Sequence, residues 1–211
     1  MSVLAELKQS VIEGEAETTE AFVQKALAGG LPPEQILKEG LIAAMSEVGR
    51  LFEAGEFFVP AMLIAARALK GGLALLRPQL AAANIQAIGK FVIGTVQGDL
   101  HDIGKNLVGV MLEGAGFEVI DLGTDVSPQK FVEAVKTHQP QFLGCSALLT
   151  TTMPRMKDAI AELQKADLRD QVKVMIGGAP ITQQYSDNIG ADLFAADATG
   201  AASCARLAVA A

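Results

Sequence analysis

The stretch "GDLHDIG", residues 98–104, contains one of the two histidines of the chain, His101, between two aspartates. Asp99 can accept the proton of one ring nitrogen of His101, which fixes the tautomer and leaves the other nitrogen free. One imidazole rarely holds a bare ion such as Zn²⁺, which takes about four ligands. A cofactor that brings its own metal and equatorial ligands needs only an axial ligand. The loop therefore favours such a cofactor over a bare ion.

Simpler interpretations of this stretch stay open. Asp99 or Asp102 could cap a helix that begins near Ile103, with His101 as a surface residue. A phosphate-binding loop is less consistent, because the glycine and lysine spacing matches neither G-x-x-x-x-G-K-[ST] nor G-x-G-x-x-G, and an acidic pair opposes a phosphate. The second histidine, His138, lies in "KTHQPQF", which we expect to be a loop.

Two further stretches have residue types suited to binding. "SALLTTT" contains Ser146, Thr150 and Thr152, and "GGAP" begins with Gly177 and Gly178, which allow a ligand to approach the backbone closely. The hydroxyls could instead cap the next helix, and the glycines could form a tight strand exit.

The first part of the chain, residues 1–80, has helical periodicity. Apolar residues recur at three- and four-residue spacing, for example Leu37, Leu41, Met45, Val48 and Phe52. Glycines and prolines separate four such runs, and the last is expected to begin at Pro60 and to end at Pro78. These features predict a four-helix bundle.

From residue 89 to 211, short apolar strands alternate with helices. Strands are expected at 90–96, 117–123, 141–147, 172–178 and 192–196, and helices from Lys105, Pro128 and about Met153, followed by two more. Five such units predict a parallel sheet of flavodoxin-like order 2-1-3-4-5. The loops after strands one, three and four, described above, would then lie at one edge of the sheet. Residues 81–88 are the expected link between the two domains.

Composition excludes several classes. The 211 residues have a net charge of −7, which argues against nucleic acid as a partner. Cys145 and Cys204 are too few for a disulfide framework and suit a reducing cytoplasm. We expect no signal peptide and no membrane partner, because the apolar segments are broken by Gly, Lys or Arg well short of a span.

Taken together, the three loops resemble a known signature. Asp99-x-His101-x-x-Gly104, then Ser146-x-Leu148, then Gly177-Gly178 is similar to the three-part motif of cobalamin-binding domains that hold the cofactor base-off. The stretch "GEFFVPAMLIAARAL" resembles the helical cap of methionine synthase and of methyltransferase corrinoid proteins. The resemblance covers nearly the whole chain and implies a corrinoid protein of an anaerobic methyltransferase system.

The resemblance also implies roles for individual residues. His101 would replace the dimethylbenzimidazole of cobalamin as lower axial ligand to cobalt, Asp99 would hydrogen-bond its other nitrogen, and Thr152, where methionine synthase has a serine, would complete the relay. Other expected cofactor contacts are Gly98, Leu100, Asp102, Ile103, Gly104, Ser146, Leu148, Thr150, Gly177, Gly178 and Ala198. In the cap, Phe58, Met62 and Ala65 would shield the upper face of the cofactor, although each could equally be a core residue.

The implied function is that of a methyl carrier, not catalytic alone, with cobalamin (as methylcobalamin when loaded) as cofactor. Its expected partners are a methyltransferase specific for the methyl donor, a second methyltransferase for the acceptor (tetrahydrofolate or coenzyme M) and a reductive activase. Methanol, methylamines, aryl methyl ethers (an O-demethylase system) and betaine all fit as donors. The expected location is the cytoplasm.

Three alternatives are weighed against this function. A cobalamin-responsive sensor commonly has a basic helix-turn-helix output module, for which we expect no room in this acidic chain. A cofactor module of an adenosylcobalamin mutase shares the motif but typically lacks the cap. A generic flavodoxin-like response domain would bind flavin instead of cobalamin.

Overall fold

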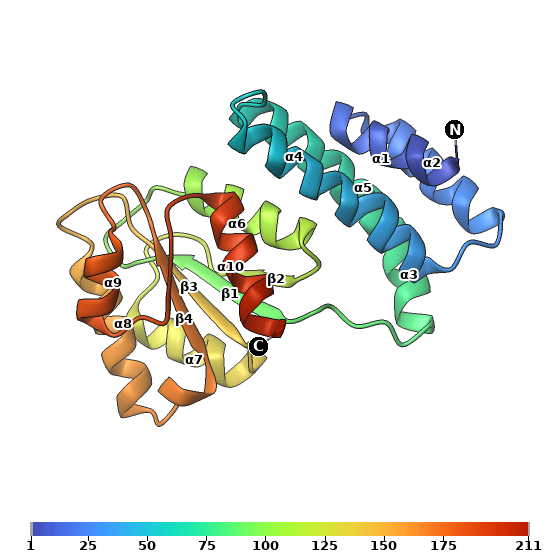
Figure 1. The fold of residues 1–211 in the computed structure, drawn as a ribbon. Helices are drawn as coiled ribbons and strands as arrows, with labels where there is room; N and C mark the ends of the chain where they lie inside the picture. The colour runs from blue at the N-terminus through green and yellow to red at the C-terminus, as the bar shows by residue number, and fades with distance from the viewer. Residues whose placement is uncertain (1, 211) are drawn as a thin grey trace. The chain divides into compact units, whose positions relative to one another are not determined.

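Helices form the first part of the chain and a five-stranded sheet with flanking helices forms the second, in a computed structural model that describes residues 2–210 (Figure 1). The described residues divide into two units, with the main break between Ala87 and Ile88. Helix α5 ends at Ala82, and residues 83–89 connect it to the first strand. The predicted domain limits, 1–80 and 89–211 with a link at 81–88, stay a prediction.

The helical unit confirms the predicted four-helix bundle. The third helix is continuous but contains a π-helical segment, η1, between α3 and α4. The elements are α1 (Val3–Glu13), α2 (Ala16–Ala28), α3 (Pro33–Gln35), η1 (Ile36–Ile42), α4 (Ala43–Glu53) and α5 (Val59–Ala82). Their buried apolar stripes form the core of the bundle, and they include Leu7, Val11, Leu41, Met45, Val48, Leu69 and Leu76.

The predicted end of the last cap helix at Pro78 is wrong. Pro78 lies inside α5, which continues to Ala82. A proline inside a helix removes one backbone hydrogen bond, but tertiary packing can override that preference. Leu80, beyond the proline, is buried, so the last turn of α5 contributes to the core.

The expectation that apolar segments fall well short of a membrane span is also wrong for α5. By length and composition alone, this 24-residue helix could cross a membrane, and it is the one such helix within residues 2–210. A core helix passes the same test, and α5 buries Met62, Leu69 and Leu76 among others. Length and composition are therefore weak evidence for a membrane segment here.

The second unit is a parallel sheet in the predicted order. Its strands are β1 (Lys90–Thr95), β2 (Glu118–Asp121), β3 (Phe142–Ser146), β4 (Lys173–Gly177) and β5 (Leu193–Ala195). They pair in the order β2-β1-β3-β4-β5, and every pair is parallel. The expected flavodoxin-like topology is confirmed, and strand order reverses between β1 and β3.

Helices cover both faces of the sheet, with α6 and α10 on one face and α7 and α8 on the other (Figure 1). They are α6 (Ile103–Gly114), α7 (Pro128–His138), α8 (Pro154–Lys165), α9 (Gln183–Ile189) and α10 (Ala198–Ala210), with a short 3₁₀ turn η2 (Arg169–Gln171). His138 is the last residue of α7, so the expected loop at this histidine is wrong. The helix extends to the residue before Gln139, whose left-handed φ of 47° ends it ahead of Pro140.

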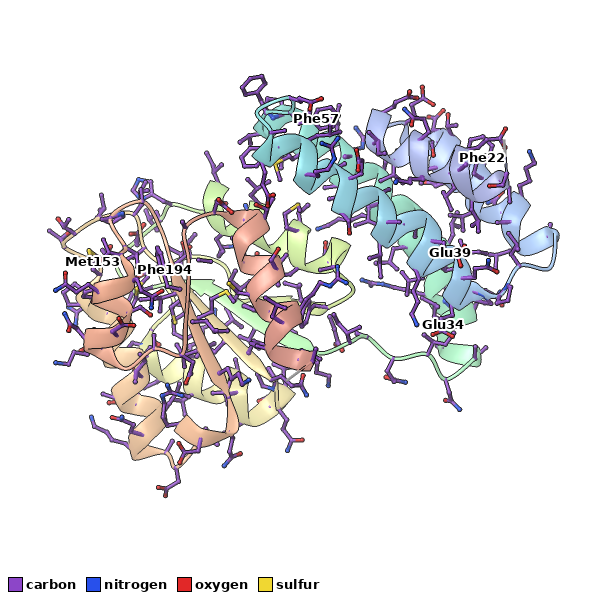
Figure 2. The ribbon with its side chains drawn as sticks, in the orientation of Figure 1. Phe22, Glu34, Glu39, Phe57, Met153 and Phe194 are labelled. Carbon is purple, nitrogen blue, oxygen red and sulfur yellow. The ribbon has the colours of Figure 1, made fainter. Side chains whose placement is uncertain are left out.

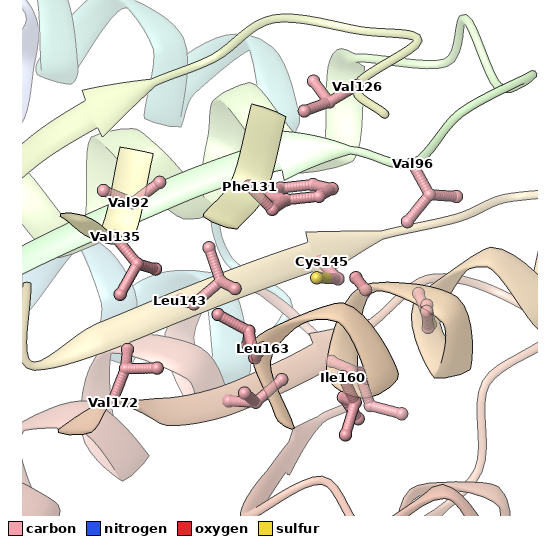
Figure 3. Close-up of a cluster of buried hydrophobic side chains, with 14 of the residues drawn as sticks. Val92, Val96, Val126, Phe131, Val135, Leu143, Cys145, Ile160, Leu163 and Val172 are labelled. Carbon is pink, nitrogen blue, oxygen red and sulfur yellow. The ribbon is translucent and has the colours of Figure 1, made fainter. Parts of the chain in front are cut away.

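A buried cluster fills the space between the sheet and helices α7 and α8 (Figure 3). It includes Val92, Val96, Val126, Phe131, Val135, Leu143, Cys145, Ile160, Leu163 and Val172. Met153 and Phe194, labelled in Figure 2, pack against it. On the opposite face, Phe91 stacks on Phe142 with ring centroids 5.5 Å apart. Because both faces are covered, the strands are apolar over most of their length, as the sequence predicted.

At the end of β4, the backbone approaches the exit of β3 very closely. Gly178 has φ of +136°, and a Cβ atom there would overlap the carbonyl oxygen of Ala147. We expect Gly178→Ala to lower the free energy of unfolding by more than about 3 kcal/mol, because backbone strain and overlap with main-chain atoms both oppose it. Gly190 (φ +74°), with no atom within 4 Å of a built Cβ, is the matched control.

Urea denaturation of the parent, Gly178→Ala and Gly190→Ala measures the difference. For Gly190→Ala we expect a loss of about 1 kcal/mol from the left-handed backbone alone. Equal losses in the two variants would show that the contact with Ala147 adds nothing.

Candidate cofactor site

Three loops leave the sheet from one row of residues. Thr95 is paired in register with Ser146, Ser146 with Gly177, and Gly177 with Ala195. The loops that follow β1, β3 and β4 therefore start side by side at the carboxyl edge of the sheet. The prediction that these loops share one edge is confirmed.

The centre of this edge is the carboxylate of Asp99, which is 1 % exposed. Its Oδ1 accepts hydrogen bonds from the backbone N–H of His101 (3.0 Å) and is 2.7 Å from His101 Nδ1. Its Oδ2 accepts from the Thr152 hydroxyl at 2.7 Å and from the backbone N–H groups of Leu148 (2.8 Å) and Leu149 (3.4 Å). One carboxylate thus joins the loop after β1 to the loop after β3.

These hydrogen bonds keep Asp99 ionised despite its burial. Burial alone would raise the pKa of Asp99, but the hydroxyl of Thr152 and the backbone N–H groups of His101 and Leu148, together with the His101 ring, lower this pKa well below its usual range. A permanent carboxylate beside Nδ1 favours the tautomer in which Nδ1 carries the proton.

The imidazole of His101 is held on one side and open on the other. Its side chain is 50 % exposed, and no hydrogen bond from residues 2–210 uses Nε2. The hydroxyl of Thr95 donates to the carbonyl oxygen of His101 at 2.9 Å, which fixes the backbone below the ring. A histidine whose Nδ1 is hydrogen-bonded to a carboxylate and whose Nε2 is free has the arrangement that metal-ligating histidines usually have.

Apolar side chains next to His101 in the sequence, and others in the loop after β3, are exposed. Leu100 and Ile103 are each 73 % exposed, and Leu148 and Leu149 are each 42 % exposed. Within residues 2–210, no group of three or more His, Cys, Asp or Glu side chains could hold a metal ion. One open imidazole, with exposed apolar side chains in its own loop and in the loop after β3, fits a large cofactor that carries its own metal and needs one axial ligand.

The capping alternatives are resolved residue by residue. Helix α6 begins at Ile103 as expected, but the Asp102 side chain accepts from the side chain of Asn106 at 3.1 Å, while the Asp102 carbonyl accepts the Asn106 backbone N–H. Thr152 is buried against Asp99, and α8 has no side-chain hydrogen bond at its N-cap. Asp99 and Thr152 are therefore not primarily helix caps.

The structure places the remaining predicted contacts at the same edge without joining them to His101. Ser146 ends β3, Thr150 is exposed in the following loop, and Ala198 is buried at the start of α10. A Cβ atom at Gly177 would lie 2.9 Å from the Ala195 carbonyl oxygen, so Gly177 and Gly178 have a packing reason of their own. Their contact with a cofactor stays a prediction, as does that of Gly98 and Gly104.

The residues proposed for the cap differ in exposure. Phe58 is 70 % exposed at the N-terminal end of α5, whereas Met62 and Ala65 are fully buried. Exposure makes Phe58 the one of the three that offers a free surface, and the shielding role of all three stays a prediction.

Sequence reasoning missed four residues that support the loop. Besides Thr95, these are Asp125, whose carboxylate accepts the Gly98 N–H at 2.7 Å, and the ion pair of Lys105 with Asp121 at 2.6 Å. A signal was present: order 2-1-3 also places the loop after β2 beside the loop after β1. The stretch "DLGTD", residues 121–125, was the polar sequence to examine there.

Comparison with known proteins agrees with this geometry. Two family models, each described as a B12 binding domain, match residues 3–77 and 89–205. The chain is 41 % identical to trimethylamine corrinoid protein 1 of Methanosarcina acetivorans over 97 % of this chain and 95 % of that protein. It is 45 % identical to dimethylamine corrinoid protein 3 of the same organism, with the same coverage of each chain.

The chain belongs to the B12-binding corrinoid proteins. The crystal structure of the methanol:cobalamin methyltransferase complex MtaBC from Methanosarcina barkeri contains a chain similar to this corrinoid protein, with a TM-score of 0.90 and 27 % identity. The match covers 99 % of this chain and 80 % of that one. The predicted family, the corrinoid cofactor and the function as a methyl-carrying component of a methyltransferase system are confirmed at this level.

The buried carboxylate leads to a stability prediction for the apoprotein. In Asp99→Asn, one of the two carboxylate oxygens becomes an NH₂ group that faces N–H or O–H donors, so we expect the free energy of unfolding to fall by about 2 kcal/mol. Urea denaturation checks this value. Asp102→Asn, at an exposed position of the same loop, is the control and should change stability little; equal effects would contradict the account of Asp99.

Because the pKa of Asp99 is lowered, the difference in unfolding free energy between the parent and Asp99→Asn should depend on pH. A carboxylate with a depressed pKa in the folded state stabilises the fold fully above its unfolded pKa, about 3.9, and loses that contribution as pH falls toward the folded value. The stability gap between the parent and Asp99→Asn should therefore shrink as pH falls below about 4. Urea denaturation between about pH 5 and 3 measures the gap; a gap that widens below about pH 4 would contradict the lowered pKa.

Proposed function

We propose that this corrinoid protein holds its cofactor base-off, with His101 Nε2 as the lower axial ligand to cobalt. The observation that supports the proposal is the pairing of His101 Nδ1 with the buried Asp99 carboxylate at 2.7 Å, while the ring stays half exposed. When bound, the corrinoid supplies a cobalt ion that accepts a methyl group from a donor and releases it to an acceptor.

The other residues of the network would orient the ligand. Asp99 would accept a hydrogen bond from Nδ1–H of His101, which leaves the Nε2 lone pair free for the metal. Thr152 donates to the same carboxylate and holds it in place at 2.7 Å. The hydroxyl of Thr152 thus does what a serine would do at this position.

The remaining predicted contacts would hold the rest of the cofactor. Leu100 and Ile103 would contact the cofactor, since they are exposed and apolar and lie next to His101 in the chain. The nucleotide tail would run past Ser146, Leu148 and Thr150 towards Gly177, Gly178 and Ala198. Phe58, with Met62 and Ala65 behind it in α5, would cover the upper face and exclude water.

The partner chemistry is proposed at the level of class. The matched methanol complex and the methylamine relatives support a partner methyltransferase that acts on a small methylated donor. A second methyltransferase on the acceptor side and a reductive activase complete the proposed set. We propose that these partners meet the protein in the cytoplasm, where the two cysteines would stay reduced.

The two histidines of the chain provide a direct test of the axial ligand. Reconstituted with cobalamin, the parent should have the visible spectrum of a nitrogen-ligated corrinoid, and its reduced Co(II) form should have nitrogen hyperfine splitting in electron paramagnetic resonance (EPR). That splitting should change multiplicity when histidine carries the heavy nitrogen isotope. His101→Ala should lose the response to the isotope, because the histidine ligand is removed and the dimethylbenzimidazole of the cofactor is unlabelled.

His138→Ala is the matched control, since His138 lies at the end of α7 and should leave the splitting intact. A parent spectrum that His101→Ala leaves unchanged would contradict axial ligation. Failure of the parent to retain cobalamin after desalting would contradict the function as a whole.

A further inference from the structure

The segment between β2 and α7 borders the loop that contains His101. Within it, residues 121–125, here called the brace, are hydrogen-bonded to the β1–α6 connection at several points. The signature motif does not include the brace, and neither do the contacts proposed above. Its role is therefore a separate question from the identity of the axial ligand.

At one end of the brace, Asp125 holds Gly98 and Asp99 from both sides. Its Oδ1 accepts the backbone N–H of Gly98 at 2.7 Å, and its own N–H donates to the Asp99 carbonyl oxygen at 3.0 Å. Asp125 has a left-handed φ of 53° and Gly98 has one of 82°. The backbone therefore turns sharply at both residues of this contact. Asp99 in turn is hydrogen-bonded to the imidazole. The position of the His101 ring therefore depends on Asp125 through Asp99.

At the other end, Asp121 is joined to the first turn of α6. The ammonium of Lys105, 2 % exposed, lies 2.6 Å from Asp121 Oδ2 and donates to the Asn106 side chain at 2.7 Å. A buried cation near a helix N-terminus is unfavourable on its own, because it opposes the helix dipole and loses its hydration. Asp121 compensates that cost, which fixes α6 to the end of β2.

The middle of the brace, at Gly123, links Asp121 to Thr95 in β1. Asp121 Oδ1 accepts the N–H of Gly123 at 2.9 Å, and the Gly123 carbonyl accepts the N–H of Thr95 at 3.0 Å. Thr95 then donates its hydroxyl to the carbonyl of His101. The backbone on both sides of the imidazole is thus tied to residues 121–125.

We propose that Asp125, with the Lys105–Asp121 pair, positions the His101 loop so that Nε2 can ligate cobalt. The inference rests on the proposed axial role of His101 and deepens it. A metal ligand must be held within about 0.5 Å of its productive position, and a loop supplies that precision only when its backbone is anchored. Asp125 is a positioning residue here, since it acts through Gly98 and Asp99.

The test compares three variants of the full chain. Asp125→Ala removes the carboxylate, Asp125→Asn keeps an Oδ1 acceptor, and Asp167→Ala is the control. Asp167 is also an exposed aspartate with a left-handed φ, 56°, but none of the described hydrogen bonds uses its side-chain oxygens. The control therefore reproduces the backbone strain and the charge change without the contact to Gly98.

Two readouts separate positioning from folding. In the apoprotein, hydrogen exchange of the Gly98 and His101 amides should accelerate about fivefold in Asp125→Ala, the effect of one lost hydrogen bond. In the cobalamin-loaded protein, the ratio of histidine-on to histidine-off cofactor should fall by about the same factor. It is measured from visible spectra over a temperature range in which both forms are populated. In Asp125→Asn, the exchange rates and the histidine-on ratio should return most of the way to the parent values. Asp167→Ala should match the parent in both.

A second variant keeps the test informative if Asp125→Ala does not fold. Lys105→Met removes the cation at the other end of the brace while filling its volume, and we expect the same decrease in the histidine-on form. Parent-like exchange and histidine-on ratios in both variants would overturn the inference. Absence of histidine ligation in the parent would instead overturn the proposed function.

Discussion

The buried carboxylate of Asp99 is the interaction on which the arrangement of this site depends. An ionised group removed from water is stable only if donors replace its hydration. Here the donors come from its own loop, from the backbone of the loop after β3 and from the Thr152 hydroxyl. Because these donors lie up to 53 residues away along the chain, satisfying the charge also assembles the site. The imidazole of His101 is one of the groups that this requirement places.

The sheet makes this assembly possible at little cost. Parallel strands in register end at the same edge, and the row Thr95, Ser146, Gly177 brings three loops to adjacent starting points. The reversal of strand order between β1 and β3 directs their following helices to opposite faces, which separates the loops at that point. Asp99 lies across this separation and joins the two loops by its two oxygens.

The sequence predicted the class of fold and the order of the strands because the apolar periodicities of the two halves differ so clearly. It predicted Asp99, His101 and Thr152 because side-chain chemistry and a known motif coincide there. It did not predict that α5 continues beyond Pro78, because burial of Leu80 is a tertiary effect. Asp125 and the Lys105–Asp121 pair were also missed. Their partners are backbone groups and a buried lysine from another element, so only the strand order, which places the loop after β2 beside the loop after β1, points to them.

The burial of Cys145 affects whether its thiol can react with a methyl group carried at this site. It directly precedes Ser146, yet its thiol lies in the buried cluster on the α7 and α8 face, and burial raises the pKa of this thiol to about 12. The thiolate is the nucleophilic form of cysteine, so at neutral pH this sulfur is almost wholly unreactive. A protein that carries an activated methyl group is exposed to self-alkylation. A thiol that is buried and protonated is a poor acceptor for a carried methyl group, although it lies one residue from the binding edge.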